Sequence, residues 1–435
     1  MYQHRQLARN SMMKYRFIYN YFTTAVCLVL ASTASFSQNI KKQFSESISI
    51  QVVNPLAIDR NDVLVSIKAE QLKNTSFNAD AFIVMDGDME LASQYNQTDE
   101  DEKGLVFMID VLKAKEKKNI TLYYNKTGKI VRNYTKRTQA ELSHKVGGRF
   151  ENREYVGGEF KNVDYLRVPP EHKDHSWFIR YEGPGWESDK VGYRFYLDQR
   201  NATDVFGKVK PEMALQKTGL DGFDSYHNMQ DWGMDVMKVG KSVGVGSIAT
   251  LYNKGALRVE KTDSVDCRIT ENGAIYSSIL TRYFGWQVGE KKHDVSSRLS
   301  IHAGSRLSRE LLTVSNNINN IATGITKDKS SKVITDKGNK EQWAYVATYG
   351  KQSLNSDNLG LAVFFKPESV NQFTEDEFSH LVSLKPQDGK VEYYFLAAWE
   401  KEPNGIVNEE AFRSYIAQVA QLLANPVQVK VLKKK

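Results

Sequence analysis

The amino-acid sequence predicts a mostly β protein built from a small N-terminal β-sandwich followed by a large antiparallel β-supersandwich. Short strand-like segments recur between residues 45 and 125, separated by polar turns. The following 300 or so residues are again strand-rich, without the strand–helix alternation of a parallel sheet. The 435 residues, of which 41% are hydrophobic and 26% charged, are enough to form more than one core.

Residues 1–37 have the pattern of a secretory signal. Lys14 and Arg16 precede an apolar run at residues 23–32, and small residues continue to Ser37. The run is shorter than the roughly 20 residues that a transmembrane helix needs. We therefore expect cleavage near Ser37 and a periplasmic or secreted protein without membrane insertion.

The charge balance and the cysteine content limit which binding partners and which disulfide bonds can be expected. After residue 37 the chain holds 55 Lys and Arg against 52 Asp and Glu, so no nucleic-acid partner is expected. Only Cys267 remains beyond the signal, which excludes an intramolecular disulfide. The oligomeric state stays open.

The predicted domains are residues 38–130, an N-terminal β-sandwich, and residues 131–435, a catalytic β-supersandwich. In the first, residues 47–53 alternate Ile48, Ile50 and Val52, and residues 62–69 alternate in the same way. In the second, strand patterns are expected at residues 177–183, 191–198, 248–261, 274–286, 306–315, 359–366 and 390–400.

Two helices are expected in the second domain. Asn408 is a suitable N-cap, and Glu409 and Glu410 suit the positive first turn. An apolar face follows before Pro426 ends the helix; it consists of Phe412, Ile416, Val419 and Leu423. A second helix is expected over residues 375–381.

The segment 177–200 has the composition of a sugar site. If its two strands alternate, Arg180 and Glu182 share one face, and the connection between the strands places Trp186 and Glu187 at a tip. An aromatic ring stacks on the C–H face of a sugar, while charged groups bind its hydroxyls. The alternative interpretation is a structural Arg–Glu pair and a Trp that closes the end of the sandwich.

The segment 226–246 places His227 in a loop that leads into a strand. An imidazole with a pKa near 6.5 exchanges protons at neutral pH, although a structural histidine is equally compatible with the pattern. The G-x-S-x-G string around Ser242 lacks the following helix of a serine hydrolase. The same GKS string is not a phosphate loop, because Asp235 stands where the first glycine belongs.

The sequence predicts no metal site and no cofactor. It leaves open whether the protein binds a structural divalent cation. The sequence has no H-E-x-x-H string and no cysteine pair for zinc. His172, Asp174 and His175 lie close together in a loop and are either metal ligands or ordinary surface residues.

Three segments resemble the bacterial family known as domain of unknown function 4861. They are residues 52–67, 181–208 and 231–246, the last containing the string Asp-Trp-Gly-Met-Asp. The resemblance implies a β-supersandwich similar to those of galactose mutarotase and polysaccharide lyases. It also implies an exported protein that acts on uronic-acid oligosaccharides of the ulvan type, as a dehydratase or lyase.

Elimination across C4–C5 of a uronate needs a neutralised carboxylate, a base for the C5 proton and an acid for the C4 oxygen. We assign the base to His227 and the neutraliser to Arg180, with Lys238 as the alternative. The acid is expected among Tyr181, Tyr193 and Tyr226. The predicted substrate-binding residues are Trp186, Glu187, Asp231, Trp232 and Asp235.

Three other functions remain open. A glycoside hydrolase would pair Glu182 or Glu187 with Asp231 or Asp235. A non-catalytic protein would bind the oligosaccharide without changing it. An epimerase similar to mutarotase would interconvert anomers.

Overall fold

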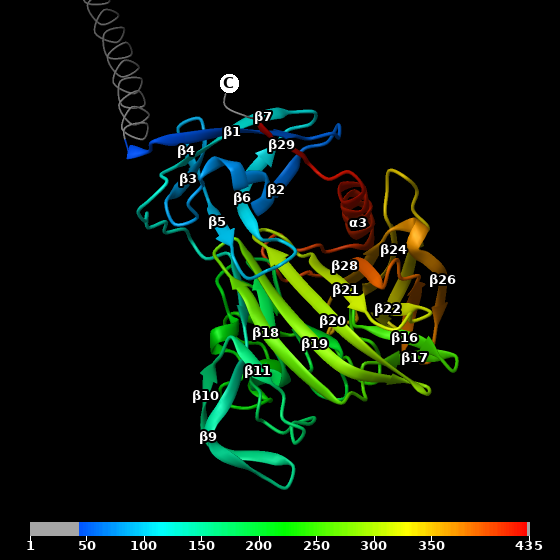
Figure 1. The fold of residues 1–435 in the computed structure, drawn as a ribbon. Coiled ribbons are helices and arrows are strands. Elements are labelled where there is room, and N and C mark those ends of the chain that lie inside the picture. The colour runs from blue at the N-terminus through cyan, green and yellow to red at the C-terminus, as the bar shows by residue number, and fades with distance from the viewer. Residues whose placement is uncertain (1–42, 433–435) are drawn as a thin grey trace, which may run out of the picture.

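The computed structural model describes residues 43–432 and consists of two β bodies (Figure 1). The predicted signal at residues 1–37 lies outside the described residues. No helix within residues 43–432 is long and apolar enough to cross a membrane.

The N-terminal body is a sandwich of two antiparallel sheets, with strand orders β29-β1-β7-β3-β4 and β2-β6-β5. A short helix and a 3-10 turn follow β2; they are α2 (Ala69–Leu72) and η1 (Lys73–Thr75). The strands are β1 (Glu46–Val53), β2 (Arg60–Lys68), β3 (Phe82–Asp86), β4 (Met89–Leu91), β5 (Ser93–Asn96), β6 (Gly104–Leu112), β7 (Lys117–Tyr124) and β29 (Gln428–Leu432).

The alternation read from the sequence gives the core of this sandwich. Ile48, Ile50 and Val52 of β1 are buried together with Val65 and Ile67 of β2. Because strand side chains alternate between faces, the polar residues between them point away from the core. The predicted N-terminal β-sandwich is therefore confirmed.

The second body is organised around a nine-stranded antiparallel sheet of order β11-β18-β19-β20-β21-β28-β25-β24-β23. These strands are β11 (Tyr165–Arg167), β18 (Ser264–Asn272), β19 (Tyr276–Val288), β20 (Lys291–His302), β21 (Ser308–Val314), β23 (Ser331–Asp336), β24 (Ala344–Gly350), β25 (Leu359–Phe365) and β28 (Lys390–Trp399). The long strands β19 and β20 lie side by side in this sheet (Figure 1).

Two five-stranded sheets share a continuous core with the nine-stranded sheet. The first has the order β15-β14-β13-β12-β8, and its strands are β8 (Thr138–Glu141), β12 (Gly185–Ser188), β13 (Val191–Phe195), β14 (Thr203–Lys208) and β15 (Gly233–Asp235). The second has the order β17-β16-β22-β27-β26, with β16 (Ala249–Tyr252), β17 (Gly255–Arg258), β22 (Ile321–Thr326), β26 (Val370–Glu375) and β27 (Ser379–Leu384). A separate hairpin pairs β9 (Ser143–Glu151) with β10 (Glu154–Asn162).

The C-terminal helix α3 (Glu409–Ala424) covers another apolar cluster, formed with residues of β24, β25 and β28. The Asn408 side chain accepts a hydrogen bond from the Ala411 N–H at 2.8 Å, as expected of an N-cap. Phe412, Ile416 and Val419 are buried, which confirms the predicted helix and most of its apolar face.

Two element predictions are wrong. Residues 375–381 are not a helix: they comprise the end of β26, the turn at residues 376–378 and the first half of β27, which pair as an antiparallel hairpin. Residues 177–183 are not a strand: Tyr181 and Glu182 have φ values of +38° and +70°, and the chain forms the 3-10 turn η2 (Arg180–Glu182). The left-handed φ values interrupt strand pairing.

The last strand in the described part of the chain, β29, returns to the N-terminal sandwich. Strand β29 pairs antiparallel with β1, so the last described residues belong to the N-terminal sandwich. The predicted division at residue 130 marks where the chain first leaves this sandwich, and the range 131–435 also includes the returning strand.

We predict that Asn408→Ala lowers the free energy of unfolding by about 0.5–2 kcal/mol, because the first turn of α3 loses its side-chain acceptor. Urea unfolding measures the change. Gln418→Ala at an exposed position of the same helix is the matched control and should stay within about 0.5 kcal/mol of the wild type. Equal stability of Asn408→Ala and the wild type would contradict the capping role.

Candidate functional site

The sheet β15-β14-β13-β12-β8 buries charged residues on one of its two faces. Glu141, Gly185, Arg194 and Asp204 lie in register across β8, β12, β13 and β14. Neighbouring positions of a strand point to opposite faces, and the residues between the charged ones, such as Tyr193 and Val205, pack into the apolar core. We call the face that carries the charged residues the polar face.

Arg194 is the centre of the polar face. Its Nη2 donates to Oδ2 of Asp204 at 2.8 Å and to Oδ2 of Asp235 at 2.6 Å, and its Nη1 donates to the Tyr226 hydroxyl at 2.9 Å. Arg194, Asp204 and Asp235 are almost completely buried. Burial and the neighbouring Asp204 raise the pKa of Asp235 well above its usual range. A proton on Asp235 would leave one positive and one negative charge in this part of the site.

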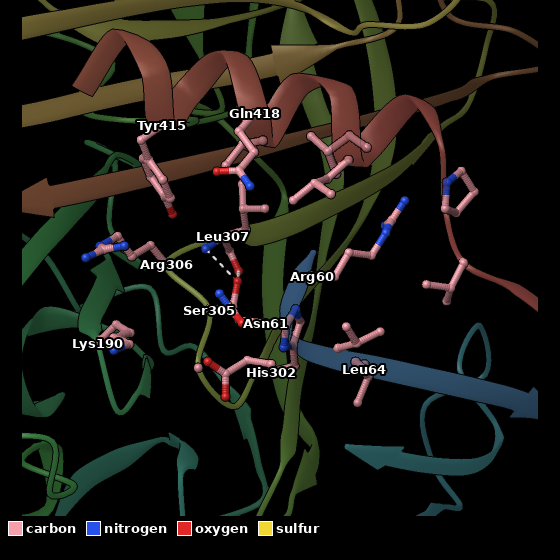
Figure 2. A pocket seen from close by; sticks show the side chains of 18 of the residues that line it. Arg60, Asn61, Leu64, Lys190, His302, Ser305, Arg306, Leu307, Tyr415 and Gln418 are labelled. Carbon is pink, nitrogen blue, oxygen red and sulfur yellow. Dashed lines mark hydrogen bonds between the residues drawn. The ribbon is translucent and has the colours of Figure 1, made fainter. Parts of the chain in front are cut away.

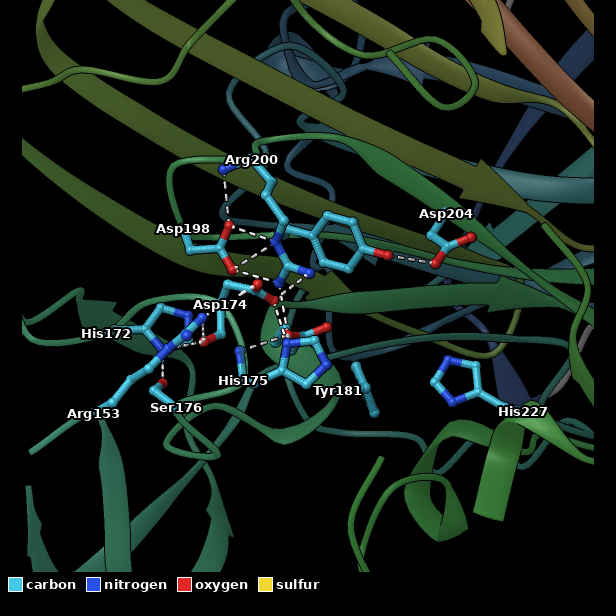
Figure 3. Close-up of polar contacts among 12 residues, drawn as sticks. Arg153, His172, Asp174, His175, Ser176, Tyr181, Asp198, Arg200, Asp204 and His227 are labelled. Atoms are coloured by element: carbon cyan, nitrogen blue, oxygen red, sulfur yellow. Dashed lines mark hydrogen bonds and ion pairs between the residues drawn. The ribbon is translucent and has the colours of Figure 1, made fainter. Parts of the chain in front are cut away.

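A second group of ion pairs surrounds Arg200 (Figure 3). Its guanidinium contacts Asp198 at 2.5 Å, Glu182 at 2.6 Å and Asp174 at 2.7 Å. Glu182 lies 3.8 Å from Nη1 of Arg194 and so connects the two groups. These contacts hold the η2 turn, whose left-handed residues would otherwise be costly.

Asp174, His175 and Glu182 could together hold a metal ion, because their ligand atoms lie within 4.8 Å of one another. Arg200 contacts both carboxylates, although it shares its single charge with Asp198 as well, and His175 Nδ1 lies 2.5 Å from Oδ1 of Asp174. His172 takes no part in this set; its Nδ1 is bonded to the Ser176 hydroxyl at 2.8 Å. The ligand atoms of this cluster are thus already engaged in ion pairs and a hydrogen bond with neighbouring residues.

The segment from residue 209 to 232 covers the polar face with the two turns η3 (Leu215–Lys217) and η4 (Ser225–His227). Gly219 lies where this cover meets η2: a Cβ atom there would be 3.3 Å from Tyr226 Cε1 and 3.5 Å from Arg180 Cγ and Tyr181 Cδ1. With φ at +68°, the position suits glycine. Arg180 and the η4 turn, far apart in sequence, are therefore neighbours.

His227 lies at the solvent-exposed margin of the polar face. Its side chain is 42% exposed, and its Nε2 lies 3.6 Å from Oδ2 of Asp235. Burial, followed by the positive charge of Arg194, lowers the pKa of His227 below its ordinary value. The imidazole is therefore neutral at pH 7 and able to accept a proton.

Arg180 lies on the same side of the sheet as His227 but is itself buried. Its guanidinium donates to Glu141 and, through Nη1, to the carbonyl oxygen of Gln216 at 3.1 Å. Its Nε has no hydrogen-bond partner among the described residues. Tyr181 donates its hydroxyl to Glu141 at 2.6 Å. One donor of Arg180 is thus unsatisfied, and it is buried beneath the surface of the described structure.

Four predicted site residues instead have structural positions, which corrects the expectation for each: Asp235 is buried in its ion pair with Arg194, and the other three are also buried. Tyr193 is fully buried on the core face, where its hydroxyl donates to the Arg306 carbonyl and accepts from the Ala397 N–H. Trp186 stacks on Tyr193 in that core and donates to Ser308 at 2.7 Å. Glu187 is buried on the polar face in an ion pair with Lys208 at 2.6 Å. None of the three reaches a ligand at the surface.

The remaining predicted residues lie around the cover. Trp232 is half-buried with its ring edge-on to Phe206, 5.8 Å between centroids, and Asp231 is 82% exposed. Lys238 is exposed beyond the end of β15. Ser242 is buried and donates to the Val239 carbonyl at 2.6 Å, so it has no role as a nucleophile.

Sequence reasoning missed Glu141, Arg194, Asp204 and Arg200. The pattern of β13 does place Arg194 opposite Tyr193 and Phe195, and such alternation normally indicates a solvent-exposed position. The signal that was available is the density of charge: Arg194 and Asp204 lie on adjacent strands among aromatic residues, a combination more typical of buried ion pairs than of a solvated face.

We predict that Arg194→Leu lowers the free energy of unfolding by about 3–5 kcal/mol, since Asp204 and Asp235 lose their shared buried cation. Urea unfolding is the measurement. Adding Asp204→Asn to this variant should restore part of the loss by removing one unpaired charge. Arg194→Leu with wild-type stability would contradict the network.

We predict that His227 titrates below pH 6.5 in the folded protein, as measured by NMR of the imidazole resonances with His227→Gln for assignment. Because the folded pKa is the lower one, the stability contribution of His227 is fully present above about pH 6.5 and is lost as the pH falls through the folded pKa. A midpoint above 6.5 would contradict the proximity of Arg194.

Comparisons with known proteins agree with the resemblance in the sequence. An uncharacterized protein of Formosa agariphila, P7, is 24% identical over 291 residues, which cover 61% of this chain and 69% of that protein. Two solved structures from Enterococcus faecalis, one in glycosyl hydrolase family 38 and one an alpha-mannosidase, match with TM-scores of 0.44 at 10% and 9% identity.

These two matches cover 89% and 90% of this chain but only 48% and 46% of those structures, so the chain spans about half their length. At this level of similarity they add nothing to the functional argument. Residues 52–429 match the family model described as "Domain of unknown function (DUF4861)". The chain belongs to this family.

Proposed function

We propose that the protein is a carbohydrate-active lyase or dehydratase that acts on uronic-acid oligosaccharides of the ulvan type. The observation that carries the proposal is the position of His227: a half-exposed imidazole, neutral at pH 7, at the margin of a buried charged surface. The signal predicted at residues 1–37 supports an exported enzyme that meets its substrate in the periplasm or outside the cell.

In the proposed reaction, Nε2 of His227 takes the proton from C5 of the uronate, and the C5–H electrons form the C4–C5 double bond. The C4–O bond breaks, and its oxygen leaves with a proton as water or as an alcohol. The products are an unsaturated uronate, a protonated His227 and a tyrosine that has given its proton to the leaving oxygen; transfer of a proton from His227 through solvent to the tyrosine restores both residues.

Tyr226 is the best placed acid of the three tyrosines considered. Its ring centroid lies 4.7 Å from that of His227, and its oxygen accepts from Arg194, which leaves its own proton for donation. Burial raises the pKa of Tyr226 to about 12, so the hydroxyl is protonated at neutral pH. Tyr181 already donates to Glu141.

Neutralisation of the substrate carboxylate is assigned to Arg180, whose Nε is unpartnered, with Lys238 as the alternative. Arg194 has a different role. It is saturated by Asp204 and Asp235 and acts on the reaction by keeping the imidazole of His227 neutral.

A glycoside hydrolase is the second candidate, and the contacts of its carboxylates make it less favourable. Glu182, Glu187 and Asp235 are each held by an arginine or lysine, and of the four candidates only Asp231 is largely exposed. Hydrolysis needs one carboxylic acid and one free carboxylate on opposite sides of the scissile bond.

Incubation with uronate oligosaccharides separates the candidates. Elimination of water gives a product lighter by one water with new near-ultraviolet absorbance, and elimination of an alcohol gives chain cleavage with the same absorbance. Hydrolysis adds one water per cleavage without a chromophore. A binding protein and an epimerase change neither mass nor absorbance.

We predict that His227→Ala lowers the rate of chromophore formation by roughly 10²- to 10⁴-fold, the usual contribution of a proton-transfer residue. His380→Ala, in the strand β27 of another sheet, is the matched control and should keep the wild-type rate. Full activity of His227→Ala would remove this residue from the mechanism.

A further inference from the structure

A second cleft lies where the N-terminal sandwich meets α3 and the turn after β20. It encloses about 460 Å³, within the roughly 300–1,000 Å³ of small-molecule pockets. Figure 2 shows Tyr415 and Gln418 projecting from α3 toward Arg306 and Ser305, with Lys190 and His302 on the opposite wall. No residue of this cleft belongs to the polar face around Arg194.

The lining of the cleft has an excess of positive charge. Asp59 is neutralised by Lys113 at 2.9 Å, and Asp62 by Arg137 at 2.8 Å; neither cation lines the cleft. Lys190 makes no ion pair within residues 43–432. The Glu402 carboxyl is close enough to interact with the charge of Lys190, but no carboxylate of the described residues is within ion-pair distance, so the ammonium group is available to a bound anion.

Two further cations line the cleft, and of these only Arg60 has no carboxylate partner among the described residues. Arg306 is balanced by Glu402 at 2.6 Å, outside the lining. Arg60 is nearly buried and has no carboxylate partner; it donates to Asn54 at 2.9 Å and to the carbonyl oxygen of Asn425, just after α3. Arg60 thus connects the sandwich to the negative end of the helix and forms one wall of the cleft.

The other groups of the lining suit a sugar. The side-chain amides of Asn61 and Gln418 have no hydrogen-bond partner in the described part of the chain and are available to hydroxyl groups. Leu64 and Leu422 add apolar surface, and the Tyr415 ring lies against the Arg306 guanidinium, 5.0 Å from centroid to Cζ. A ligand with one acidic group, several hydroxyls and a C–H face would use all of these features.

We propose that this cleft is a second carbohydrate site, which binds a small acidic sugar with its carboxylate or sulfate on Lys190 and its hydroxyls on Asn61 and Gln418. The choice of an acidic sugar among other hydroxylated acids rests on the proposed function. In this proposal the site holds the sugar without reacting with it: His302 and Asp62 line the cleft, but His302 Nδ1 is bonded to the Ala303 carbonyl at 2.9 Å and Asp62 is paired with Arg137.

Hydrogen exchange with mass spectrometry locates the binding. In the wild-type protein, glucuronate should slow exchange in residues 302–307 and in the second half of α3, while glucose at equal concentration should not. Inorganic sulfate is the third probe. Protection by sulfate as strong as by glucuronate would overturn the sugar assignment, and protection by glucose would overturn the role of charge.

Variants test the contacts. Lys190→Gln should weaken glucuronate binding by about tenfold or more, the value of one charge-assisted hydrogen bond. Gln418→Trp fills the cleft from an exposed helix position and should abolish the protection. Lys117→Gln removes an exposed, unpaired lysine of β7 and is the control for loss of charge. Unchanged protection in both cleft variants would overturn the proposal.

The proposed reaction at His227 and the proposed binding in the cleft can be tested independently of each other. His227→Ala should lose chromophore formation yet keep the glucuronate protection at α3, whereas Gln418→Trp should show the reverse. If the protection at α3 disappears in His227→Ala, the cleft is not a separate site and the proposal is overturned, whatever the outcome for the reaction.

Discussion

The ion pairs of Arg194 with Asp204 and Asp235 are the constraint on which the rest of the site depends. A guanidinium and two carboxylates buried on a sheet face must be paired and enclosed, because an unpaired charge there would cost several kcal/mol. The sheet achieves this by placing its apolar face in the common core and covering its charged face with the segment 209–232. The cover in turn carries Tyr226 and His227 to the margin of the charged surface.

This arrangement gives each group near the margin a distinct protonation state. Partial burial, followed by the positive charge of Arg194, lowers the pKa of His227 and keeps it neutral, while burial raises the pKa of Tyr226 and keeps its hydroxyl protonated. A base and an acid side by side, both in their active forms at neutral pH, suit an elimination in which one proton is taken and another is given. The strained η2 turn places Arg180 beside them and is itself held by Arg200.

The fold could be predicted from the sequence where side-chain periodicity decides burial. The alternating residues of β1 and β2 form the sandwich core, and α3 follows from its cap and apolar face. The return of β29 to β1 carries no local signal, because pairing between distant strands depends on the whole chain. Residues 177–183 have a strand-like composition, but ion pairs with Arg200 hold them in a turn.

The site could be predicted only in part, because its side chains come from segments that are distant in the sequence. His227 and Arg180 lie on one side of the sheet, as the sequence argument required. Besides burial, however, the cation that lowers the pKa of His227 is Arg194. Trp186 and Tyr193 have the composition of a sugar platform and fill the core instead. Composition indicates which chemistry a segment offers, whereas the face on which each side chain lies is set by strand register.

The most direct test of this account is a crystal structure of His227→Ala with an unreacted uronate oligosaccharide. The account predicts that the sugar lies over the margin of the polar face, with C5 of the uronate next to position 227 and its carboxylate toward Arg180. A well-ordered oligosaccharide bound elsewhere, with position 227 and Arg180 facing only solvent and protein, would contradict it.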